Sequence, residues 1–246
     1  MRLALIADIH GNLPALDAVL AEIDREGVDR LVCLGDISVG PQPVETLERV
    51  RSLGCPVILG NWDAWFVEGA PHLNGKLASV LLELHAWSAG QFSREQREYL
   101  GGFEPLLEVP LTAGESLLAF HGSPQSYEDM ILATTPDQEL ERMFAGRSAL
   151  VLAGGHTHFQ LCRRFGESLL VNPGSVGLPF RRRREGVMGI APWAEYGLVD
   201  HDGGRLSVDL RRTTFDVEGF LETMRSTGMP HADWWASLWT EEHAAL

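Results

Sequence analysis

The chain has 246 residues, of which 45% are hydrophobic and 22% charged, and this balance is typical of a globular protein with one substantial core. The formal net charge of −14 argues against a large nucleic-acid-binding surface, although bound metal ions could still attract a small anionic substrate. Because no apolar run approaches membrane-spanning length and no signal peptide is evident, we expect no membrane contact and a cytoplasmic location. The three cysteines form no CxxC pair and are expected to be reduced.

Short apolar runs alternate with helical patterns in the first 60 residues. Between the runs, Leu16, Val19, Leu20 and Ile23 recur at helical spacing. The expected strands are 3–7, 31–34 and 56–59, and the expected helices are 14–26 and 44–53. Glycines at positions 27 and 54 are expected to end these helices. This order predicts βαβ units and a parallel sheet.

The rest of the chain predicts one long helix at 75–100 and then mostly strands. A hairpin is expected around Ala113-Gly114. The later elements are strands 106–111, 116–120, 150–153, 159–165, 168–171, 194–200 and 205–212, with a helix at 137–145. We therefore expect a second, more antiparallel sheet packed on the first. With helices outside, this gives a four-layer α/β-β/α sandwich with two mixed β-sheets, and no linker or repeat divides residues 1–246.

The C-terminal segment 228–246 is rich in tryptophan. Spacings of three and four place Trp235, Leu238 and Trp239 on one face of a helix. We expect this helix to pack on the domain. A lid or a dimer contact is the alternative, since an exposed tryptophan patch favours a partner, so a homo-oligomer formed through this helix stays open.

Residues able to bind metal follow the predicted strands, beside glycines. They are Asp8, His10, Asp36, Asn61, His121, His156 and His158. A single histidine after a strand is more often structural, but four of the nine histidines occupy such positions. In open α/β sheets, ligands bind beyond the carboxyl ends of the strands. Seven nitrogen and oxygen donors with a carboxylate available to bridge suit two divalent ions.

Two divalent ions point to chemistry at phosphorus. Such a pair stabilises an in-line displacement by holding the attacking and leaving oxygens. A metal-bridging water has a pKa lowered toward neutrality, which makes hydroxide available without a side-chain base.

The order of five short motifs resembles that of the calcineurin-like metallophosphoesterase superfamily. The motifs are Asp8-Ile9-His10, Gly35-Asp36, Gly60-Asn61-Trp62-Asp63, His121-Gly122 and Gly155-His156-Thr157-His158. With Asn172-Pro173-Gly174-Ser175, they are similar to its compact prokaryotic phosphodiesterase branch, over about residues 1–180. The resemblance implies a phosphoesterase, more a phosphodiesterase than a monoesterase, that hydrolyses small phosphate esters. It also implies two divalent metals, with Mn²⁺ expected first and Fe, Zn²⁺, Ni²⁺ or Mg²⁺ as alternatives.

By position, the resemblance also implies a ligand set for each metal. One metal would bind Asp8, His10, Asp36 and His158. The other would share Asp36 and bind Asn61, His121 and His156. The catalytic candidates are Asp36, Asn61, Trp62 and Asp63.

Trp62 departs from the family pattern, which has histidine there to stabilise or protonate the leaving oxygen. An indole N–H donates a hydrogen bond but has no proton to give, so we expect a slower enzyme that favours good leaving groups or recruits another acid. Trp62 either closes the site or stacks on substrate, and Asp63 is expected to orient the loop or a ligand. A scaffold without catalysis and a protein Ser/Thr phosphatase are the alternative functions.

The run from Arg181 to Arg184 is the one dense basic stretch. Guanidinium groups suit phosphate, so Arg181 and Arg182 are candidates for substrate contact. A solvated loop is the alternative.

Overall fold

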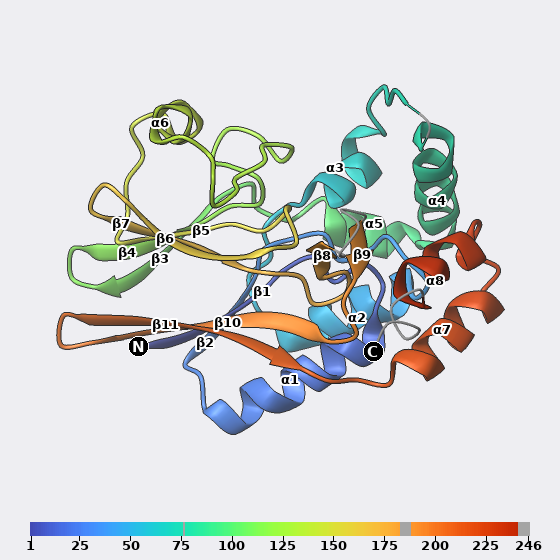
Figure 1. The fold of residues 1–246 in the computed structure, drawn as a ribbon, viewed down its shortest axis with the longest axis horizontal. Helices are drawn as coiled ribbons and strands as arrows, with labels where there is room; N and C mark the ends of the chain where they lie inside the picture. The colour runs from blue at the N-terminus through green and yellow to red at the C-terminus, as the bar shows by residue number, and fades with distance from the viewer. Residues whose placement is uncertain (76, 183–187, 241–246) are drawn as a thin grey trace.

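Two mixed β-sheets pack face to face, and helices cover their outer faces (Figure 1). The computed structural model describes residues 1–75, 77–182 and 188–240 of the chain. In Figure 1, α6 lies over the outer side of one sheet and α1 lies over the outer side of the other. The predicted four-layer sandwich is confirmed.

The first sheet has the strand order β11–β10–β1–β2. Its strands are β1 (Arg2–Ile6), β2 (Arg30–Cys33), β10 (Ala194–Asp202) and β11 (Arg205–Thr213). The β1 strand pairs in parallel with β2 and antiparallel with β10. Leu3 and Leu5 of β1 face the second sheet, whereas Ala4 and Ile6 face the helices. This two-sided burial explains why the strand is a continuous apolar run.

Helices α1 (Leu13–Glu26) and α2 (Pro43–Leu53) pack on the outer face of the first sheet. The four apolar residues predicted to share one face of α1 are all buried. Gly27 and Gly54 end the two helices in the left-handed conformation, at φ 64° and 60°. Both helix predictions are confirmed.

The second sheet has the order β3–β4–β5–β7–β6. Its strands are β3 (Leu107–Thr112), β4 (Glu115–Ala119), β5 (Val151–Ala153), β6 (Gln160–Phe165) and β7 (Ser168–Pro173). Leu140 and Phe144 of α6 (Asp137–Phe144) cover its outer face. Its inner face meets the first sheet through valine, leucine and alanine side chains.

Three expectations about the elements are wrong. Residues 56–59 form no strand, because only Val57 and Ile58 make single bridges, to Cys33 and Glu104. The expected helix 75–100 is two helices, α4 (Ala78–Gln91) and α5 (Arg94–Leu100), because Phe92 is extended and a Ser93 capping box starts the second. The β10–β11 hairpin joins the first sheet instead of the second, because β1 has an edge to which β10 can pair.

Four elements lie outside the predicted set, and they gather near the C-terminal helix. They are α3 (Asn61–Glu68), β8 (Phe180–Arg182), β9 (Met188–Ile190) and α7 (Val217–Ser226). The C-terminal helix α8 (Ala232–Thr240) packs on α7 and β9, with Trp235 and Trp239 buried. Residues 241–246 of the predicted C-terminal segment lie outside the described residues. None of the described helices is long and apolar enough to span a membrane.

The loop after β7 packs directly on the loop after β1. Val176 and Gly177 donate backbone N–H groups to the carbonyls of Ala7 and Asp8, at 2.9 and 3.0 Å. A Cβ on Gly177 would lie 1.8 Å from the carbonyl oxygen of Ile9, so no side chain fits there. Glycine is therefore required at this contact.

We expect Gly177→Ala to lower the free energy of unfolding by about 2 kcal/mol or more, because the added methyl must displace backbone. Gly90→Ala in α4 is the matched control, since a Cβ at Gly90 meets nothing within 4 Å, and it should keep or slightly raise stability. Urea unfolding followed by circular dichroism measures both. Equal stability of the two variants would contradict the close contact.

Candidate functional site

The seven predicted ligands come together at the carboxyl ends of the strands. Asp8, His10 and Asp36 follow strands of the first sheet, and Asn61 begins α3. The three histidines His121, His156 and His158 follow strands of the second sheet. All but His156 are buried, with exposures of 0–6%. The site therefore lies where the two sheets meet.

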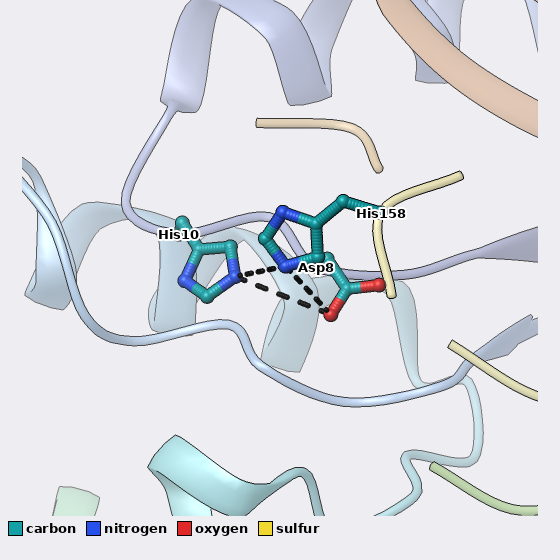
Figure 2. A group of neighbouring side chains, drawn as sticks. All are labelled: Asp8, His10 and His158. Carbon is teal, nitrogen blue, oxygen red and sulfur yellow. Dashed lines mark hydrogen bonds and ion pairs between the residues drawn. The ribbon is translucent and has the colours of Figure 1, made fainter. Parts of the chain in front are cut away.

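The first group consists of Asp8, His10 and His158 (Figure 2). The Nε2 atoms of His10 and His158 are 3.0 Å apart. The Asp8 Oδ1 atom lies 3.4 Å from His158 Nε2 and 4.0 Å from His10 Nε2. The three side chains thus direct one oxygen and two nitrogens at the same small space, as the ligands of one cation would.

The second group consists of Asp36, His121 and His156, with Asn61 between the two imidazoles. The Asn61 Oδ1 atom is 3.1 Å from His121 Nε2 and 2.9 Å from His156 Nδ1. The Asp36 Oδ2 atom is 3.5 Å from His121 Nε2. These donors suit a second cation.

Asp36 faces both groups. Its Oδ2 atom, close to His121, is also 3.8 Å from Nε2 of His10. Its Oδ1 atom accepts a hydrogen bond of 2.9 Å from the backbone N–H of Trp62, which fixes the carboxylate. This position between the groups is the one that a carboxylate shared by two metals needs.

Backbone carbonyls orient two of the imidazoles. The Nδ1 atom of His121 lies 2.7 Å from the carbonyl oxygen of Leu34, and that of His158 lies 2.8 Å from the carbonyl oxygen of Leu178. An N–H at Nδ1 donates to the carbonyl and leaves the Nε2 lone pair directed into the site. The nitrogen and oxygen donors present therefore fit divalent transition metals.

Charges in the site favour a cation. Burial, together with a neighbouring imidazole, lowers the pKa of His10 and of His156 to about 4, so both are neutral at pH 7, the form that binds metal. Burial alone would raise the pKa of Asp8 and of Asp36, but the adjacent histidines hold both below the usual value. Burial would lower the pKa of His121, yet Asp36 and Asp8 raise it to about 10, so without a metal this imidazole carries a proton that a bound cation would displace.

The residues that carry these ligands hold an unusual backbone conformation. Seven non-glycine residues of the described chain have positive φ, and five of them are candidate ligands. The five are Asp8, His10, Asp36, His156 and His158, with φ between 49° and 68°. Aspartate and histidine tolerate this left-handed region better than most residues. Such strain gathers at functional sites.

Asp63 ties the loop after β2 to the start of α3. Its carboxylate accepts backbone N–H groups from Asp36 at 2.7 Å, Ile37 at 3.2 Å and Gly60 at 3.4 Å. All three of these partners are backbone groups. The Asp63 carboxylate therefore holds the backbone that carries Asp36 and Asn61. The orienting role expected for Asp63 matches this geometry.

Trp62 forms part of the wall of a pocket of about 400 Å³ that opens on Asp36, Asn61, His156 and His158. Its half-buried ring packs against Trp65, with ring centroids 4.4 Å apart. Phe180 stacks on His158 at 4.4 Å and lines the same pocket. The side chain of Trp62 therefore lines the pocket and closes one side of the site.

The structure does not bring Arg181 into this pocket. Its guanidinium carbon lies 5.7 Å from the ring centroid of Trp193. The side chain of Arg182 and all of Arg183 and Arg184 lie outside the described part of the chain. Within the described residues, no lysine or arginine lines the pocket. A phosphate contact by Arg181 or Arg182 stays a prediction.

Two further polar residues hold the ligand loops. Ser175 donates a 2.7 Å hydrogen bond to the carbonyl of Asp8, and Asn172 donates one of 2.6 Å to the carbonyl of Gly155. Both side chains are buried at the end of β7. The sequence analysis quotes these residues only as part of a motif, but polar residues after a buried strand at the same sheet edge are the signal that identifies them.

Comparisons with known proteins agree with this geometry. A family model described as the calcineurin-like phosphoesterase superfamily domain matches residues 1–191. The chain is 26% identical over 246 residues to an uncharacterised protein of Methanocaldococcus jannaschii, covering 93% of each chain. It is 28% identical over 213 residues to the phosphodiesterase YfcE of Escherichia coli, covering 82% of this chain and 89% of YfcE.

A solved structure also matches the whole fold. The crystal structure of a metallophosphoesterase from Sphaerobacter thermophilus aligns with a TM-score of 0.76 at 27% identity. The alignment covers 100% of this chain and 99% of that chain. The resemblance that the five motifs indicate is confirmed.

We expect Asp63→Ala to lower the free energy of unfolding by about 3 kcal/mol or more, because three backbone N–H groups near the site lose their acceptor. Asp17→Ala serves as the control, since exposed Asp17 pairs with exposed Arg49 at 2.7 Å and its loss should cost at most about 1 kcal/mol. Thermal and urea unfolding measure the difference. Similar losses in both variants would show that Asp63 does not hold the loops.

Proposed function

The chain belongs to the calcineurin-like phosphoesterase superfamily, and we propose that it is a metal-dependent phosphoesterase that prefers phosphodiesters to monoesters. The observation that carries this proposal is the convergence of seven nitrogen and oxygen donors into two groups that share Asp36. The similarity to a protein named as a phosphodiesterase supports the same reaction.

The two groups suggest how a pair of metals would be held. Asp8, His10, Asp36 and His158 would bind one ion, and Asp36, Asn61, His121 and His156 would bind the other. Mn²⁺ is our first choice, and the mixed donors also suit Fe, Zn²⁺, Ni²⁺ or Mg²⁺. When bound, two such ions would supply a nucleophile from water at neutral pH and neutralise charge on the phosphoryl group.

The chain's own residues favour a diester. A phosphate monoester carries between one and two negative charges at pH 7, whereas a diester carries one. Within the described residues the pocket offers no lysine or arginine to bind the extra charge. Trp62, at the position of the usual histidine, has an N–H that can donate a hydrogen bond to an oxygen but cannot protonate a leaving alkoxide. We therefore infer that good leaving groups are hydrolysed fastest.

A scaffold that has lost catalysis is the second candidate, and Trp62 is the observation that favours it. The complete ligand set opposes it, because loss of catalysis usually removes ligands as well. A protein Ser/Thr phosphatase would need an open groove, and the pocket at the ligands is instead walled by Trp62, Phe159 and Phe180. Bound metal separates the first two candidates directly.

Purified protein reconstituted with Mn²⁺ should hold two metal equivalents per chain and hydrolyse bis(p-nitrophenyl) phosphate. Asp36→Ala and His156→Ala should lose at least about 10²-fold in kcat/KM, because removal of a metal ligand weakens transition-state stabilisation. Metal content is measured by plasma mass spectrometry and turnover by nitrophenolate release. A wild type as inactive as both variants, with no bound metal, would establish the scaffold instead.

Trp62→His should raise the hydrolysis of diesters with poor leaving groups by about 10- to 100-fold, because general acid catalysis is typically worth about 10²–10⁴-fold. Esters of p-nitrophenol should gain little, since their leaving group needs no proton. Trp62→Phe keeps an aromatic ring without a polar hydrogen and should give no gain. An equal change on both ester types would exclude leaving-group protonation as the missing step.

A further inference from the structure

An apolar pocket of about 310 Å³ lies beside the candidate metal ligands. Its polar side chains are His10 and His158 of the first group, and its remaining lining is apolar. The apolar wall comes from α3, α4, the β8–β9 hairpin and α8, which Figure 1 shows gathered at one end of the molecule. The main wall residues are Trp62, Leu77, Leu81, Phe180, Trp234 and Leu238.

This pocket adjoins the pocket that opens on Asp36. Trp62, His158 and Phe180 line both. A phosphoryl group at the candidate ligands would therefore extend one of its ester groups toward the apolar wall. The wall offers that group aromatic and aliphatic contacts, and within the described residues the two imidazoles are its only ionisable side chains.

Two wall residues leave apolar surface exposed to water. Leu77, at the N-cap of α4, is 49% exposed, and Trp234 of α8 is 36% exposed. Covering such side chains with an apolar group is favourable, at about 25 cal/mol per Å² removed from water. The pocket volume falls in the range of small-molecule sites, so a single organic group fits better than a protein segment does.

We propose that this pocket binds the alcohol group of the substrate, so that the protein acts on phosphate esters of a large apolar alcohol, aryl or long alkyl. The proposal rests on the proposed phosphoesterase function. It gives Trp62 a binding role, because the ring that replaces the usual histidine forms part of the apolar wall.

The test compares the affinities of two alkylphosphonates, each of which carries one alkyl group on phosphorus and is not hydrolysed. The binding of methylphosphonate and of hexylphosphonate to the Mn²⁺-loaded protein is measured by calorimetric titration and by competition with bis(p-nitrophenyl) phosphate in turnover. Each buried methylene is worth about fourfold in affinity, so hexylphosphonate should bind at least about tenfold tighter. Its heat-capacity change on binding should also be more negative, which marks burial of apolar surface.

The double variant Leu77→Ala/Trp234→Ala tests the apolar wall. Both side chains are exposed, so their loss should not unfold the protein. We expect the preference for hexylphosphonate to fall to about threefold or less, with methylphosphonate binding unchanged. Leu82→Ala is the matched control, because Leu82 is 37% exposed on α4 and does not line the pocket. It should keep the full preference.

The outcomes separate the two proposals. Equal affinity for the two phosphonates, or a preference that survives Leu77→Ala with Trp234→Ala, would overturn the apolar alcohol site even if diesters are hydrolysed. A preference that depends on Leu77 and Trp234 in a protein that hydrolyses no ester would support the pocket and overturn the proposed function.

Discussion

The candidate site depends on the left-handed backbone conformation of five of its residues, at the ends of the strands. Each non-glycine residue in that region costs about 1 kcal/mol or more, so five of them approach the net stability of a typical domain, about 5–15 kcal/mol. Hydrogen bonds between the loops hold the conformation. Asp8 and His10 donate backbone N–H groups to Gly35 and Asp36, at 2.9 and 3.1 Å, so the pairing of β1 and β2 continues past the strands. The same hydrogen bonds therefore hold both the sheet edge and the candidate ligands in place.

Each ligand group contains members from both sheets. Asp8 follows a strand of the first sheet, and His158 follows a strand of the second, yet their ligand atoms lie 3.4 Å apart. The leucine, valine and alanine core between the sheets sets that separation. A close-packed interior transmits small displacements, so a change of side-chain volume in this core would alter the spacing of the ligands.

Sequence patterns predict the strands before six of the seven candidate ligands, because buried strands have strong, short-range signals, but they mispredict the segment before Asn61 as a strand and miss α3. The ligand residues are recognisable as polar positions after apolar runs, and their order resembles a known family. The partner of β10 is not predictable, because alternation indicates a strand and not the edge to which it pairs. One helix is predicted over residues 75–100 because apolar residues recur at helical spacing up to Trp87, whereas the chain breaks at the extended Phe92 and the Ser93 cap. The short β8–β9 pair gives too few residues for a pattern.

Part of the apolar wall comes from a stretch of sequence beyond all of the candidate ligands. All seven candidate ligands occur by residue 158, whereas Trp234 and Leu238 belong to α8, the last helix described. The strained loops tolerate little change, because their backbone contacts depend on one another. The exposed face of α8 has no such dependence. Mutations accumulating in the C-terminal helix would therefore reshape the proposed alcohol pocket over evolutionary time, while the candidate ligands stay in place.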